Sequence, residues 1–140
     1  AYPDANGTLR LTFGRVQGYA PRDGLLATPF TTLAGWSAKH HSPDYEGPTW
    51  HATAAATTPD LPVDFLSDVD TTGGNSGSAT LNGRGHLIGL LFDGNYESMA
   101  AGWQFDPATT RSIHLDIRYL LWLIRQQGGD WILKEWTFAP

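Results

Sequence analysis

The spacing of apolar residues changes once along this 140-residue chain, and that change constrains the fold more than any other feature. Before residue 116, apolar and polar residues alternate in short runs separated by glycine-, proline- and asparagine-rich turns, which is typical of half-buried β-strands. After it, apolar residues recur at the three- and four-residue spacing of an amphipathic helix. The chain is therefore predicted to be all-β, a barrel or sandwich half closed by a C-terminal α-helix.

The expected elements follow from these runs and from the turn residues between them. Strand regions are predicted at 8–16, 63–67, 79–92 and 102–115, the last divided by a turn at 106–110. Asn82–Gly85 interrupts the third region as a hairpin, and Asn-Gly favours positive φ at both of its residues. The helix is predicted at 116–127, with Asp116 as its N-cap and Gly128-Gly129 as its stop.

The first half of the chain carries weaker signals. A turn is expected at 18–24 and an edge strand at 28–33, because Pro29 cannot donate to a central ladder. Prolines and polar residues dominate 35–62, so we expect an exposed excursion there with one short helical turn.

Composition bounds the possible partners. The length suits one domain, and only 16% of residues are charged, which indicates a surface partly covered by another segment. A net charge of −5 argues against binding nucleic acid or an anionic membrane. The chain has no cysteine, no apolar run of membrane-spanning length and no signal-peptide pattern at its start. No metal-ligand spacing or dinucleotide fingerprint is present, so no metal and no cofactor are expected.

A glycine-rich turn at 71–78 places one serine, Ser76, after a predicted strand. In a Gly-x-Ser-Gly turn, the serine hydroxyl can project as a nucleophile. The N–H groups of Gly74 and Ser76 can then form an oxyanion hole. The alternative is an ordinary flexible loop, since Gly, Asn and Ser are the usual residues of turns.

A nucleophilic serine needs a base, usually a histidine oriented by a carboxylate. The five histidines are His40, His41, His51, His86 and His114, and none has a context that marks it as that base. If the chain belongs to a serine hydrolase, its base is expected outside these 140 residues.

Several blocks of the sequence are together more specific than the serine turn alone. They are Gly73-Gly74-Asn75-Ser76-Gly77, Leu87-Ile88-Gly89-Leu90, Phe92-Asp93-Gly94-Asn95, Phe105-Asp106-Pro107, Arg111-Ser112-Ile113 and Asp116-Ile117-Arg118-Tyr119-Leu120. With Tyr2-Pro3-Asp4-Ala5-Asn6 near the start, they resemble the C-terminal part of the bacterial dipeptidyl-peptidases 7 and 11. The recognisable blocks cover roughly half of the chain and concentrate after residue 63.

The resemblance implies a chymotrypsin-like double β-barrel in which residues 1–140 form the C-terminal half of the catalytic domain: the second barrel and a terminal helix. The catalytic His and Asp would belong to the first barrel and a helical domain would be inserted, so this chain alone would be incomplete and inactive. The family also implies a bacterial periplasmic, cell-surface or secreted location, with a homodimer as a possible assembly.

The same resemblance assigns residue roles. Ser76 would be the nucleophile of a serine exopeptidase that removes dipeptides from peptides with a free N-terminus. Asp93 matches the residue that binds the substrate ammonium. Gly94 stands where acidic-specific members carry arginine, so an apolar penultimate residue is expected, as in the dipeptidyl-peptidase 7 type. The alternative is a non-catalytic peptide-binding or assembly module, since no triad His or Asp is evident in the chain.

Overall fold

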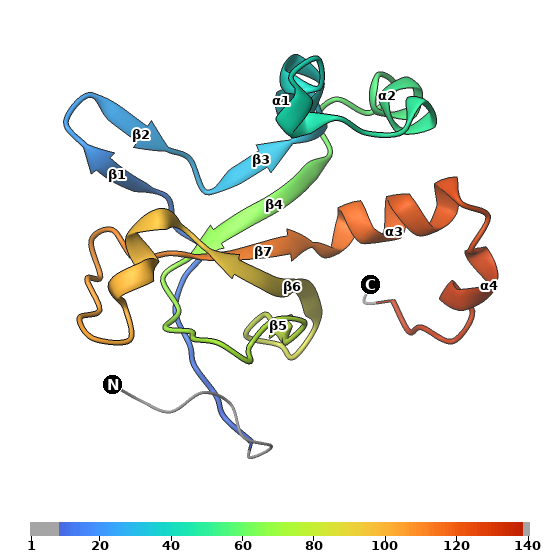
Figure 1. Ribbon diagram of the computed structural model, residues 1–140. Coiled ribbons are helices and arrows are strands. Elements are labelled where there is room, and N and C mark those ends of the chain that lie inside the picture. The colour runs from blue at the N-terminus through green and yellow to red at the C-terminus, as the bar shows by residue number, and fades with distance from the viewer. Residues whose placement is uncertain (1–8, 139–140) are drawn as a thin grey trace.

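A five-stranded antiparallel sheet forms the centre of the molecule, whose computed structural model describes residues 9–138. In spatial order its strands are β3 (Phe30–Thr32), β4 (Pro62–Ser67), β7 (Ser112–Asp116), β6 (Leu87–Gly94) and β5 (Ala79–Leu81). Two further strands, β1 (Tyr19–Arg22) and β2 (Leu25–Ala27), form a separate hairpin at one end of the sheet (Figure 1).

Buried and half-buried side chains alternate along β4 and β7, and the buried positions include polar residues: Ser112, His114 and Asp116 of β7 are each 2% exposed. β4 pairs with β7 in unbroken register, with Phe65 opposite His114 and Ser67 opposite Ser112. Phe65 is 2% exposed and Leu91 of β6 is 6% exposed. Each such side chain stabilises the fold by about 1.5–3 kcal/mol relative to an exposed position.

The helices lie at one end of the sheet and share a core with it (Figure 1). They are α1 (Leu33–Lys39), α2 (Thr49–Ala55), α3 (Ile117–Gln126) and α4 (Asp130–Leu133), with the 3₁₀ turn η1 (Pro43–Tyr45) between α1 and α2. A second 3₁₀ turn, η2 (Tyr96–Ala100), follows β6 at the opposite end of the sheet (Figure 1). Leu33, Ala55 and Trp122 form the buried centre of the helical cluster. The Asp116 side chain accepts a hydrogen bond from Arg118 N at 2.9 Å, so it caps α3 as the sequence predicts.

The segment 35–62 is not the exposed excursion that its prolines indicate. It carries most of α1 and all of α2, and His51 and Ala55 are buried within it. Pro48 occupies the N-cap of α2, a position that needs no backbone N–H, so the prolines delimit this helix and do not prevent it. The described part of the chain is therefore rich in β-sheet with several helices, more than the terminal helix and the one short helical turn that the sequence predicts.

The strand predicted at 8–16 is also absent from the described residues 9–16. Its one ladder contact is an isolated bridge between Val16 and Ser67. Leu9, Leu11 and Phe13, the apolar half of the alternation, are 83–92% exposed. Alternation predicts which side of a strand will be buried, but a strand forms only where a neighbouring backbone supplies hydrogen bonds.

In the region 102–115, only Ser112–Asp116 forms a strand. The predicted strand at 102–105 is wrong because the chain there continues as turns after η2, with Trp103 N and Gln104 N both donating to Ala100 O. A local carbonyl satisfies these donors, so no ladder partner is required.

The hairpin between β5 and β6 is present, but its turn differs from the expected one. Gly85 has φ +80°, whereas neither Asn82 nor Gly83 has positive φ. The Asn82 side chain instead accepts hydrogen bonds from Arg84 N and His86 N at 2.9 and 3.0 Å. Asparagine therefore acts here through its amide oxygen, as in an Asx-turn.

Candidate active site

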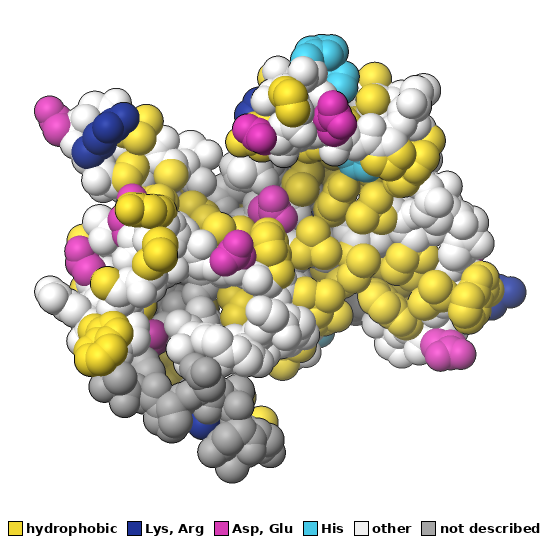
Figure 2. Space-filling model, in the orientation of Figure 1, with side chains coloured by type: hydrophobic (Ala, Val, Ile, Leu, Met, Phe, Trp, Pro, Cys, Tyr) yellow, Lys and Arg dark blue, Asp and Glu magenta, His cyan; other side chains and the backbone are white. Residues whose placement is uncertain are grey.

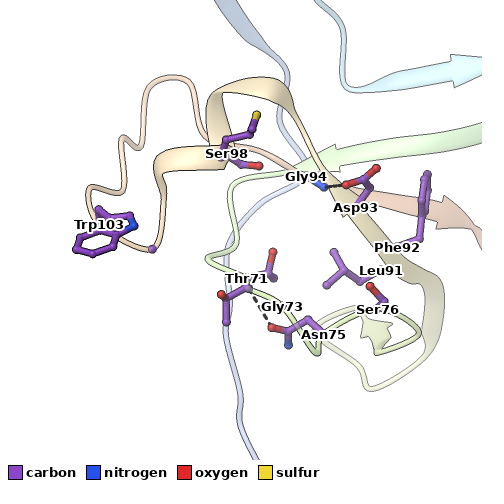
Figure 3. A pocket seen from close by; sticks show the side chains of 13 residues that line it. Thr71, Gly73, Asn75, Ser76, Leu91, Phe92, Asp93, Gly94, Ser98 and Trp103 are labelled. Carbon is purple, nitrogen blue, oxygen red and sulfur yellow. Dashed lines mark hydrogen bonds between the residues drawn. The ribbon is translucent and has the colours of Figure 1, made fainter. Parts of the chain in front are cut away.

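A cavity of about 350 Å³ lies where the serine turn, the end of β6 and the chain after η2 meet (Figure 3). It brings Ser76, Asp93 and Gly94 together, which the sequence alone places in two separate segments. Gly74 lies in the same turn but does not line the cavity. The lining is completed by Thr71, Thr72, Gly73, Asn75, Leu91, Phe92, Ser98, Met99, Gly102 and Trp103.

Short backbone hydrogen bonds hold the serine turn against β6. Asn75 folds back on the turn, since its N–H donates to Thr72 O and its side-chain oxygen accepts from Thr72 N, at 3.2 and 3.0 Å. Gly77 N donates to Leu91 O at 2.7 Å and ties the turn to the strand. Gly74 and Gly77 have φ of +94° and +85°, a conformation that other residues adopt only with strain.

Several polar groups of this turn have no partner among the described residues. They include the N–H groups of Gly74 and Ser76 and the Ser76 hydroxyl. Ser76 is exposed, so its hydroxyl is accessible to a ligand. The turn therefore offers a free nucleophile with two unused backbone donors within three residues, which are the group types required for attack on a carbonyl and for binding its oxyanion.

A β-bulge presents Asp93 to the cavity. β6 pairs Leu91 with His114 but Asp93 with Ile113, so Phe92 is an extra residue in the ladder. Such a bulge re-aims the side chains that follow it. Phe92 and Asp93 are consequently both exposed at the cavity, where one Asp93 oxygen accepts from Gly94 N at 2.8 Å. The other carboxylate oxygen has no partner among the described residues and can accept from a ligand.

A buried polar network supports the wall beyond Gly94. Asn95 exchanges hydrogen bonds with the backbone of Arg111: Asn95 N donates to Arg111 O and Arg111 N donates to Asn95 Oδ1, at 2.9 and 2.8 Å. Arg111 is 1% exposed, and its guanidinium donates to carbonyl oxygens of Gly18, Pro107, Ala108 and Thr110. The sequence did not single out Arg111 for any structural role, because nothing local distinguishes a buried arginine from a solvated one.

None of the five histidines, all of which are in the described part of the chain, lines this cavity. His114 is 2% exposed, stacks on Phe65 and has both ring nitrogens engaged, with Ser67 Oγ at 2.6 Å and Thr80 Oγ1 at 2.7 Å. His51 is buried and its Nε2 lies 2.7 Å from the Tyr119 hydroxyl. Neither is placed to take a proton from Ser76.

Burial lowers the pKa of His114 to about 4, so its ring is neutral in the folded protein at pH 7. In the unfolded chain the pKa returns to about 6.5, so acid favours unfolding. We expect the protein to lose on the order of 3 kcal/mol of stability from this group as the pH falls from 6.5 to 4. Urea unfolding at pH 7 and pH 4 measures this loss. His114→Gln, which cannot titrate, should show a smaller pH difference than the wild type, and an equal difference would contradict the assignment.

Two searches concern the described residues 9–138 only. No helix there is long and apolar enough to cross a membrane. No group of three or more His, Asp or Glu side chains there is arranged to hold a metal ion.

The described cavity joins an exposed serine on a glycine turn to a carboxylate but contains no histidine, so its geometry alone does not define a reaction. Comparison with known families places the chain more closely. The Peptidase S46 family model matches residues 1–137, and the chain belongs to this family.

The similar curated relatives include dipeptidyl-peptidases of two names. The chain is 41% identical to an Asp/Glu-specific dipeptidyl-peptidase of Shewanella putrefaciens, with 96% of this chain and 23% of the relative covered. It is 42% identical to dipeptidyl-peptidase 7 of Phocaeicola vulgatus, with 91% and 19% covered. The chain thus spans about a fifth of the length of these relatives. The two identities are nearly equal, so overall similarity does not assign the chain to either type.

Solved structures of the same family share the fold. The crystal structure of Porphyromonas endodontalis DPP11 in complex with substrate has a TM-score of 0.86 and 37% identity, covering 96% of this chain and 21% of that one. The complex of the same enzyme with the dipeptide Arg-Glu gives 0.85 and 36%, covering 91% and 20%.

Proposed function

We propose that this chain is the part of a serine dipeptidyl-peptidase that supplies the nucleophile, the oxyanion hole and the substrate pocket. The observation that carries the proposal is the single cavity that joins Ser76, Asp93 and Gly94. Relatives named as dipeptidyl-peptidases, and DPP11 structures in complex with dipeptides, support the substrate class.

The proposed reaction uses each free group of the site once. The substrate ammonium binds the Asp93 carboxylate, which places the second peptide bond next to Ser76. Ser76 Oγ forms a bond to the carbonyl carbon and gives its proton to a histidine outside this chain, while the N–H groups of Gly74 and Ser76 bind the oxyanion. The C–N bond then breaks, the histidine protonates the leaving amine, and water releases the dipeptide from the acyl-enzyme.

The cavity lining supports a preference for an apolar penultimate residue. The carboxylate of Asp93 is its one ionisable side chain among the described residues, so an acidic substrate side chain finds no cation there. Leu91, Phe92, Met99 and Trp103 supply apolar surface. Burying an apolar side chain against such surface is favourable, whereas an unpaired carboxylate pays a desolvation cost.

The remainder of the peptidase is the proposed partner of this chain. Apolar side chains form a broad band across the face shown in Figure 2, and a surface of this kind indicates contact with another segment. The absence of any histidine from the cavity lining agrees with a base supplied from a first barrel.

We also propose a more specific fold: residues 9–16 complete the second barrel of a chymotrypsin-like double barrel when the whole protein is present. A cavity of about 550 Å³ separates this segment from β5, and Leu11 and Phe13 line it together with Thr80 and Leu81. Pairing along the free edge of β5 would bury the apolar alternation and remove an exposed strand edge. Amide hydrogen exchange on the full-length protein should show protection at alternate residues of 9–16, and uniformly fast exchange there would reject the closed barrel.

A second candidate, favoured by the lack of a base in the cavity, is a peptide-binding or assembly module without hydrolysis. The test that separates the two is dipeptide release from a chromogenic substrate with a free N-terminus and an apolar second residue. Full-length protein should release the dipeptide. The Ser76→Ala variant and the isolated 140-residue chain should release none. Inactive full-length protein that still binds the peptide would favour the module.

A further inference from the structure

A side chain at position 94 would meet one obstacle. A Cβ atom added to Gly94 would collide with the Ser98 hydroxyl and lie 3.1 Å from Ser98 Cβ. The next atom, Arg111 O, is at 3.6 Å, which is ordinary van der Waals contact. The space that a larger residue 94 needs is therefore blocked by the side chain of Ser98 and not by the backbone.

Ser98 is held in this position by its own hydrogen bonds. Its hydroxyl donates to Asn95 O at 2.6 Å, and its N–H donates to the same oxygen at 2.9 Å. Asn95 is 7% exposed and is bonded to Arg111, so the acceptor is part of the buried network. Figure 3 shows the Ser98 side chain beside Gly94 at the wall of the cavity, which both residues line. Turning the hydroxyl away would cost the bond to Asn95.

We propose that Ser98 is a second specificity-determining residue of this site, coupled to Gly94. The inference rests on the proposed function and deepens it: Ser98 fills the position from which a residue-94 side chain would enter the pocket, so the pocket stays without a cation and suited to apolar penultimate residues. A change of specificity towards an acidic penultimate residue then requires two substitutions: a cationic residue at 94 and a smaller residue at 98.

Four full-length proteins test this: wild type, Gly94→Arg, Ser98→Ala and the double variant, each assayed for kcat/KM with Leu or Asp as the penultimate residue. Gly94→Arg alone should lose at least about tenfold on the Leu substrate and gain little on the Asp substrate, because overpacking distorts the wall. The double variant should exceed Gly94→Arg on the Asp substrate by roughly tenfold or more, since coupled neighbours are non-additive. Ser98→Ala alone carries no cation at 94, so it should not gain on the Asp substrate relative to the Leu substrate.

Gly102 provides a matched control, since it lines the same cavity and an added Cβ there meets no atom within 4 Å. The activity of Gly102→Arg should be independent of Ser98→Ala. The proposal is overturned if Gly94→Arg alone cleaves the Asp substrate as well as the double variant does.

Thermal unfolding tests the coupling of Ser98 to Gly94 without an activity assay, so it can fail or succeed independently of the proposed peptidase function. Gly94→Ala should lower the midpoint of thermal unfolding, and Ser98→Ala should restore it, whether or not Ser76 is the nucleophile. A midpoint for Gly94→Ala that Ser98→Ala leaves unchanged contradicts the coupling. Wild-type protein that releases no dipeptide contradicts only the proposed function.

Discussion

Replacing Ser76 with alanine in the full-length peptidase is expected to lower kcat/KM for dipeptide release by at least about 1,000-fold. The reason is that the hydroxyl forms the covalent bond to the substrate, and no other described hydroxyl in the turn combines exposure with adjacent unused N–H donors. Initial rates with a chromogenic dipeptide substrate measure the loss, and KM for the substrate should change much less than kcat.

Ser78 supplies a control in the same turn. It is also exposed, but its N–H donates to Asn75 O and its carbonyl accepts from Leu91 N, so it belongs to the link with β6. Ser78→Ala should keep activity within about threefold of wild type, as is usual for surface substitutions. Retention of most activity by Ser76→Ala would remove Ser76 from the reaction.

Asp93→Asn is expected to lower kcat/KM roughly 30- to 100-fold on substrates with a free N-terminus, because a charge-assisted hydrogen bond to the ammonium is lost. The substitution keeps the side-chain shape, and Asn Oδ1 can still accept from Gly94 N, so the bulge should persist. Wild type should strongly prefer a free N-terminus over the N-acetylated peptide, and the variant should lose most of that preference.

Asp23 is a suitable control, since it is an exposed carboxylate in the β1–β2 turn and does not line the cavity. Asp23→Asn should leave the ratio between free and acetylated substrates unchanged. If Asp93→Asn also leaves that ratio unchanged, the ammonium anchor lies elsewhere.

Local signals were sufficient for the elements whose stability is local. The amphipathic spacing and the Asp116 cap predict α3 to within a residue at each end. The turn composition at 82–85 predicts the hairpin, although Gly85 rather than Gly83 takes the positive φ. In both cases the residues that decide the structure are neighbours in the sequence.

Features that depend on distant contacts could not be predicted in this way. The prolines at 43–62 suggest a loop, but burial of Ala55 against Leu33 and Trp122 makes α2 part of a core. Residues 9–13 alternate like a strand but find no ladder within the described chain.

The same distinction applies to the candidate site. The glycine-rich turn indicated Ser76 as a candidate nucleophile, whereas Asp93 and Gly94 were selected by a family resemblance. The cavity that joins the three depends on the β6 bulge at Phe92, which no local pattern predicts. Ser98 was not selected at all. Its importance depends on the distance to a Cβ that Gly94 lacks, and that distance exists only in three dimensions.

The central claim, that Ser76 is the nucleophile of a dipeptidyl-peptidase, is tested most directly by labelling the full-length enzyme with a fluorophosphonate and identifying the modified residue by peptide mass spectrometry. Activated serine nucleophiles react with such probes, whereas ordinary surface serines do not. The account predicts one adduct, on Ser76, formed in step with loss of dipeptide release and slowed by a competing dipeptide. Loss of activity with the adduct on another residue and Ser76 unmodified would contradict it.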